Sequence, residues 1–158
     1  MYQHVKKWRS AFLVYLTHQM ALPLLKLIRK PEIFPYTAEQ LAHFPAGTLG
    51  NDLAIFLHKK QLALLPYYAR HDMKHILLEY DTTDEGEGCL QCFMLGNRHV
   101  SIPVIATVLY CFATMPEHWK KFAAAYKNGR QAPPIAGWKW FDILTEPTAD
   151  LQQMIHKK

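Results

Sequence analysis

The order of apolar and polar residues along the chain predicts helices throughout. Most apolar stretches have the length and spacing of amphipathic helices, and they are bounded by capping residues, prolines or glycines. Thr37 and Gln40 form a capping box that opens one short helix. Ser101 and Pro103 begin an apolar helix that runs to about Ala113. The pattern therefore predicts an all-α protein, a multi-helix bundle in a single domain.

Turn and capping residues set the boundaries of the other predicted helices. One helix is predicted from the turn Gly47–Gly50 to about Leu62, and Pro66 opens the next. After the loop 81–86, a helix begins at Glu87 and ends at Gly96-Asn97. A second capping box, Thr114–Glu117, precedes a helix that ends near Asn128-Gly129. No internal repeat and no long linker interrupts the series. We therefore expect one domain over residues 1–158.

Residues 1–30 form a basic, amphipathic segment. Apolar residues share one side of the predicted helix and polar residues the other: Val5, Trp8, Phe12, Tyr15, Leu16 and Met20 against Lys6, Lys7, Ser10, Thr17 and His18. Residues 1–31 contain no Asp or Glu, which suggests a negatively charged partner such as a membrane surface. The same segment can also be interpreted as a first helix that covers the core, or as an organellar transit peptide.

Composition and cysteine count limit the class of protein to which the chain can belong. Half of the 158 residues are hydrophobic, so we expect the chain to bury a substantial core and not to be disordered. Three cysteines, an odd number, argue for a reducing compartment, and the Cys89-x-x-Cys92 pair is interpreted as packing. The apolar stretch Ala11–Leu22 is too short and too polar to span a bilayer. No nucleic-acid-binding module is recognisable.

Two imidazoles and two carboxylates lie close together in the sequence, at His71, Asp72, His75 and Glu87. On a helix, His71 and His75 are about 40° apart and Asp72 is about 100° from His71, so all three can face one pocket. Glu87, in the first turn of the next helix, can face the same surface. Imidazole nitrogens and carboxylate oxygens suit Zn²⁺ and other divalent first-row metals. The spacing therefore predicts a metal site on two adjacent helices.

Other interpretations of these residues are open. Buried helical histidines are usually satisfied by hydrogen bonds, and Asp72 could pair with Arg70 or Lys74. The HExxH pattern of zinc proteases has glutamate where this chain has Asp72, so proteolysis is poorly supported. A His-Asp phosphohydrolase would need one more histidine and one more aspartate. His58 and Asp142 can be nominated, but nothing in their surroundings recommends them.

The motif His-Asp-x-x-His, followed by eleven residues and Glu, resembles the signature of the Coq4 family of ubiquinone-biosynthesis proteins. The resemblance covers roughly residues 45–155 and includes Gly47-Thr48-Leu49-Gly50 with Phe56-Leu57, Gly86-Glu87 with Leu90 and Phe93, Asn128-Gly129-Arg130-Gln131-Ala132, Trp140, and Asp150-Leu151. The chain departs from the family at Glu79, where the family often has glycine, and at Gly88-Cys89, which replaces more usual helix formers.

The resemblance implies an all-α protein, peripheral to a membrane, with zinc or iron held by His71, Asp72, His75 and Glu87. It implies a role on a polyprenylated quinone precursor. That role is either an enzyme that replaces a ring carboxyl by hydroxyl, or a non-catalytic lipid-binding or scaffolding protein with a structural metal. The chain resembles a short bacterial relative, which implies a cytoplasmic location at the inner membrane. Further expected partners are another lipid, other quinone-biosynthesis proteins and a second copy of the chain, but no nucleic acid.

A polyprenyl partner would need an apolar groove. The nominated side chains are Phe56, Ile76, Leu77, Phe93, Met94, Val104, Val108, Tyr110 and Phe112. Each of them taken singly is more simply explained as ordinary core.

Overall fold

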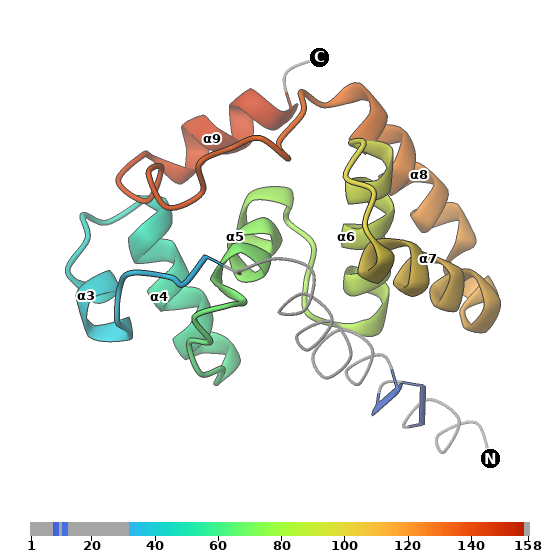
Figure 1. Ribbon diagram of the computed structural model, residues 1–158, viewed down its shortest axis with the longest axis horizontal. Helices are drawn as coiled ribbons and strands as arrows, with labels where there is room; N and C mark the ends of the chain where they lie inside the picture. Colours follow the sequence, from blue (N-terminus) through green and yellow to red (C-terminus); the bar gives the residue numbers. More distant parts are fainter. Residues whose placement is uncertain (1–7, 10, 13–31, 157–158) are drawn as a thin grey trace. The chain divides into compact units, whose positions relative to one another are not determined.

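The computed structural model describes residues 8–9, 11–12 and 32–156, and within these ranges the protein is all-α (Figure 1). Its helices are α3 (Ala38–Ala42), α4 (Leu49–Lys60), α5 (Ala69–Leu78), α6 (Asp84–Gly96), α7 (Ile102–Thr114), α8 (Trp119–Gln131) and α9 (Thr148–His156), with a short 3₁₀ helix at Pro116–His118. The predicted fold class is confirmed. Within the same ranges, no helix combines the length and the apolar character needed to cross a membrane.

The described residues fall into two compact units. The first contains α6, α7 and α8 with the described N-terminal residues, and the second contains α3, α4, α5 and α9. The expectation of a single domain over residues 1–158 stays a prediction. The amphipathic helix expected over residues 1–30 lies mostly outside the described residues.

In the first unit, α6 and α8 pack closely because each places a glycine against the backbone of the other. A Cβ atom at Gly96 would lie 2.1 Å from the carbonyl oxygen of Tyr126, and one at Gly129 would lie 2.1 Å from that of Phe93. No larger residue is accommodated at either position unless the backbone moves. Gly129 lies in the last turn of α8, which ends at Gln131, two residues beyond the end predicted near Asn128-Gly129.

Asn97 joins the end of α6 to the segment that follows α8. Its side-chain amide donates to the carbonyl oxygens of Gly129 at 3.0 Å and Pro133 at 2.9 Å, and its Oδ1 accepts from the Ile135 amide at 2.9 Å. Because this buried side chain is satisfied at both ends, it fixes the chain reversal after α6. The helix end predicted at Gly96-Asn97 is confirmed.

The second predicted capping box does not form. Thr114 is the last residue of α7, and its hydroxyl donates to the Tyr110 carbonyl at 2.7 Å, one turn earlier. An N-cap residue needs extended backbone, which a residue inside a helix cannot adopt. The chain instead forms the 3₁₀ helix, and α8 begins at Trp119 without a side-chain cap.

In the second unit, α5 packs against both α4 and α9. The side-chain amide of Gln152 on α9 donates to the Ile76 carbonyl of α5 at 3.0 Å. The capping box at the start of α3 is confirmed, since Thr37 Oγ1 accepts from the Gln40 amide at 3.2 Å and Gln40 Oε1 accepts from the Thr37 amide at 2.8 Å. The packing on α4 and α9, with the Gln152 bond, holds α5, which carries the two candidate histidines.

Several side chains nominated for an apolar groove belong instead to the cores of the units. The buried ones are Leu77, Phe93, Met94 and Val104. Their contribution is packing, as the simpler interpretation predicted.

Candidate metal centre

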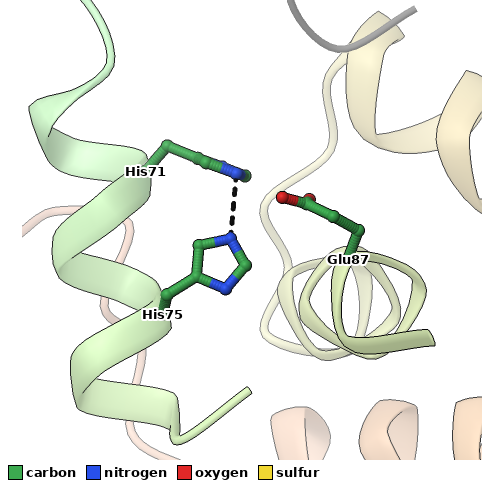
Figure 2. A group of neighbouring side chains, drawn as sticks. All are labelled: His71, His75 and Glu87. Atoms are coloured by element: carbon green, nitrogen blue, oxygen red, sulfur yellow. Dashed lines mark hydrogen bonds between the residues drawn. The ribbon is translucent and has the colours of Figure 1, made fainter. Parts of the chain in front are cut away.

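His71 and His75 lie one turn apart on α5 and turn their rings toward each other (Figure 2). Their Nε2 atoms are 3.1 Å apart, and the ring planes are inclined by 83° with centroids 4.7 Å apart. Two imidazole nitrogens bound to one metal at about 2.0–2.1 Å would be about 3.3 Å apart in a tetrahedral site and about 3.0 Å apart at neighbouring octahedral positions. The observed separation of the histidine nitrogens matches either geometry.

The other nitrogen of His75 is held by the backbone. His75 Nδ1 lies 2.9 Å from the carbonyl oxygen of Tyr80, and because a carbonyl only accepts, Nδ1 carries the proton. Nε2 then carries the lone pair, and His71 is the donor between the two Nε2 atoms. A carbonyl that accepts from the outer nitrogen of a histidine is the usual support of a metal ligand, since it fixes both the tautomer and the ring orientation.

The backbone carbonyl reaches His75 because α5 ends in a left-handed residue. Glu79 has φ 56° and ψ 27°, a conformation that glycine adopts more easily than other residues. This explains the departure noted at Glu79, because the chain adopts the glycine-type helix end with a different residue. His75 itself is buried, and the Phe56 ring is stacked on it at 6.2 Å.

Glu87 projects from the start of α6, which the structure places at Asp84, earlier than predicted. The Thr83 hydroxyl caps the helix by accepting from the Gly86 amide at 3.2 Å, and the Asp81 carboxylate accepts from the Thr83 amide at 2.9 Å. Residues 81–86 were predicted as a loop, and Thr83 was not recognised as the N-cap. For this reason the predicted start of the helix is later, at Glu87.

Glycines on either side of Glu87 let α6 approach its neighbours closely. A Cβ at Gly86 would lie 2.1 Å from the Asp81 carbonyl, and one at Gly88 would lie 2.6 Å from the Phe122 ring. The glycine at Gly88, where a better helix former was expected, therefore has a packing role. Both glycines fix the position of the turn that carries Glu87.

His71, His75 and Glu87 form a group that could hold a metal ion. One ligand atom from each side chain lies within 4.8 Å of the other two, and Figure 2 draws the three together. Two imidazole nitrogens and one carboxylate oxygen are ligands that suit zinc and iron. Asp72, the fourth predicted ligand, is a half-buried residue of α5 outside this group. Its role as a ligand stays a prediction.

The two basic neighbours of Asp72 have aromatic and acidic contacts of their own. Arg70 forms an ion pair with Glu32, and its guanidinium lies 4.9 Å from the centre of the Phe141 ring. Lys74 Nζ lies 5.6 Å from the centre of the Trp140 ring, and burial, with a smaller effect of Arg70, lowers the pKa of Lys74 to about 8. Sequence patterns gave no signal for these contacts, because their partners lie far away along the chain.

The residues nominated for other chemistry do not join the candidate metal group. His58, in the last turn of α4, and Asp142 are exposed, and neither belongs to the group. Cys89, Cys92 and Cys111 are buried free thiols. Burial is the main cause that raises the pKa of Cys89 to about 11 and of the other two to about 12. Neutral buried thiols are poor nucleophiles, which agrees with packing.

Comparison with known proteins supports the fold. No protein-family model and no curated protein matches the chain. Among solved structures, it is similar to a "Putative ubiquinone biosynthesis protein" from Nostoc punctiforme PCC 73102, with a TM-score of 0.64 and 17% sequence identity over 96% of this chain and 81% of that chain. At this identity the similarity shows a shared fold.

Proposed function

We propose that His71, His75 and Glu87 bind one divalent transition-metal ion, and that the chain is a Coq4-type protein of isoprenoid-quinone biosynthesis. The observation that carries the proposal is the pair of Nε2 atoms 3.1 Å apart, one of them fixed by the Tyr80 carbonyl. The spaced motif in the sequence supports the same conclusion. So does the fold shared with the Nostoc protein, whose description refers to ubiquinone biosynthesis.

The number of ligands favours an enzyme over a purely structural metal site. A structural zinc site normally has four protein ligands, whereas two histidines and one carboxylate leave coordination positions for water or substrate. The group His71, His75 and Glu87 has this composition. A fourth ligand from Asp72 would close the site and favour the structural role instead.

The proposed reaction replaces the carboxyl group of a prenylated aromatic ring by hydroxyl. The carboxyl carbon leaves as CO₂ and the ring carbon takes one oxygen atom from water. The two electrons released in this oxidation reduce O₂ to H₂O₂, so O₂ is the oxidant. A bound iron ion would supply Lewis-acid and redox chemistry for this change. The residues of the chain hold the ligands in place: the Tyr80 carbonyl orients His75, and the capped first turn of α6 orients Glu87.

Turnover tests the enzymatic role. The full chain is loaded with Fe²⁺ without oxygen, then given O₂ and a prenylated hydroxybenzoate, and CO₂ and the product mass are measured. We expect turnover that falls at least about 100-fold in His71→Ala, His75→Ala and Glu87→Ala, with an unchanged circular dichroism spectrum. His58→Ala is the matched control, since His58 is an exposed histidine outside the group. No turnover in the wild type contradicts the enzymatic role.

A second candidate role is lipid binding without catalysis, and the surface of α7 supports it. This helix contains no charged residue, and one stripe of its side chains is exposed: Ile102 by 59%, Ile105 by 39%, Leu109 by 65% and Phe112 by 38%. An exposed apolar stripe on an uncharged helix is suited to the interfacial region of a membrane.

Vesicle flotation tests the lipid-binding role. Leu109→Glu places a charge in the exposed stripe of α7 and should abolish flotation with vesicles of mixed neutral and anionic phospholipid. Ala124→Glu adds the same charge to an exposed position of α8 and should leave flotation unchanged. Equal flotation of the wild type and Leu109→Glu would exclude α7 as the lipid-binding surface.

A further inference from the structure

Arg9 is an N-terminal residue that contacts the first turn of α6. Its Nη1 donates to the Glu117 carboxylate at 2.7 Å and to the Thr114 carbonyl at 3.3 Å, and its Nε lies 3.5 Å from Asp84 Oδ2. The side chain of Arg9 is only 12% exposed, so these ion pairs are poorly screened by solvent. The guanidinium thus links α6 to the segment between α7 and α8.

The backbone of Arg9 is held as well. The Tyr110 hydroxyl of α7 donates to the Arg9 carbonyl at 3.0 Å, and the Phe12 ring packs on the Tyr110 ring with centroids 5.1 Å apart. A long side chain on a fixed backbone has lost much of its freedom already, so its charge stays at one place. Arg9 is therefore a fixed support for Asp84.

Asp84 and Glu87 are neighbours on the surface of α6. They are three residues apart, the spacing at which side chains of one helix meet. The turn between them contains Gly86, and Gly88 follows Glu87 directly. Glycine is a much weaker helix former than alanine. A helix start with two glycines depends on contacts from outside to keep its geometry.

We propose that Arg9 is a positioning residue for Glu87: by holding Asp84 it fixes the first turn of α6, so that the Glu87 carboxylate is preorganised for the metal ion. The inference rests on the metal site of the proposed function. Supporting residues around metal ligands typically contribute about 10- to 100-fold to metal affinity. Loss of Arg9 should weaken metal binding by this factor without the removal of a ligand.

Cobalt binding to the full chain tests this role. Co²⁺ affinity is measured by competition with a chelator, and the visible spectrum of bound Co²⁺ reports the ligand geometry. Arg9→Gln and Asp84→Asn should each weaken Co²⁺ binding about 10- to 100-fold and change the spectrum. Because both act through the same ion pair, the double variant should bind Co²⁺ as tightly as the weaker-binding of the two single variants. Arg9→Lys, which keeps the charge, should recover part of the affinity. Arg130→Gln removes the same charge from an exposed position of α8 and is the matched control.

The outcomes separate this inference from the metal site itself. If the wild type binds no Co²⁺, the metal site is wrong and the role of Arg9 falls with it. If the wild type binds Co²⁺ but Arg9→Gln and Asp84→Asn stay within about threefold of Arg130→Gln, the metal site stands and the role of Arg9 is overturned. Should Arg9→Gln fail to fold, as judged by circular dichroism, Asp84→Asn alone decides by the same criterion.

Discussion

His75 Nδ1 donates to the Tyr80 carbonyl at 2.9 Å, and this bond determines which nitrogen of His75 faces His71. The bond exists because Glu79 adopts a left-handed conformation at the end of α5, which returns the backbone toward His75. A change of conformation at one exposed residue thus supports the tautomer of a buried histidine.

Glu79→Gly should stabilise the protein. A left-handed backbone costs a non-glycine residue about 1–2 kcal/mol. Glycine removes this cost, and its larger loss of chain entropy takes back about 0.5–1 kcal/mol, so we expect a net gain of about 0.5–1 kcal/mol in the free energy of unfolding. Urea denaturation measures it. Glu146→Gly is the control, because Glu146 is exposed and its φ is not positive. This variant should lose about 0.5–1 kcal/mol in the free energy of unfolding, since glycine brings only its entropy cost there. A loss in Glu79→Gly would show that its φ carries no strain.

Gly129→Ala should destabilise the first unit. Its Cβ would lie 2.1 Å from the Phe93 carbonyl, so α6 and α8 must separate, at a cost of about 1–3 kcal/mol. Gly137→Ala is the matched control, since a Cβ there meets no atom within 4 Å, and its effect should stay within about 0.5 kcal/mol. Equal effects of the two substitutions in thermal or urea denaturation would contradict the close crossing of the two helices.

Stability should fall as pH rises above 9. An unfolded thiol has a pKa near 9, and burial raises the pKa of the Cys92 thiol to about 12, so the folded state keeps a proton that the unfolded state loses. The stabilisation is fully present below the unfolded pKa and is lost as pH rises toward 12, by about 1.4 kcal/mol per thiol between pH 8 and 10.

Urea denaturation at pH 8 and pH 10 measures this loss. Cys92→Ala removes one of the three buried thiols, so its loss of stability between these pH values should be smaller than that of the wild type by about 1.4 kcal/mol. Identical pH profiles of the two proteins would show that Cys92 ionises equally in the folded and unfolded states.

Local signals predicted much of the fold. The capping box at Thr37 and the helix end at Asn97 depend on residues that are close in the sequence, and both are found where the sequence places them. The spacing of His71 and His75 similarly fixes their approach on one helix face. Such features need no knowledge of the tertiary structure.

The features that sequence analysis missed depend on tertiary contacts. Asn128-Gly129 has the composition of a helix end, but Gly129 is required where α6 meets α8. Thr114 has the spacing of an N-cap, but α7 continues through it. The support of His75 by Tyr80 uses a backbone carbonyl, which no pattern of side chains can reveal.

The metal content of the purified protein tests the central claim most directly. The full chain is purified without oxygen and reconstituted with Fe²⁺ or Zn²⁺, and bound metal is measured by elemental analysis beside His75→Ala and the exposed-histidine control His58→Ala. We predict about one metal ion per chain in the wild type and in His58→Ala, and less than about one tenth of that in His75→Ala. Equal metal content in all three proteins, or none in the wild type after reconstitution, would contradict a metal site at His71, His75 and Glu87.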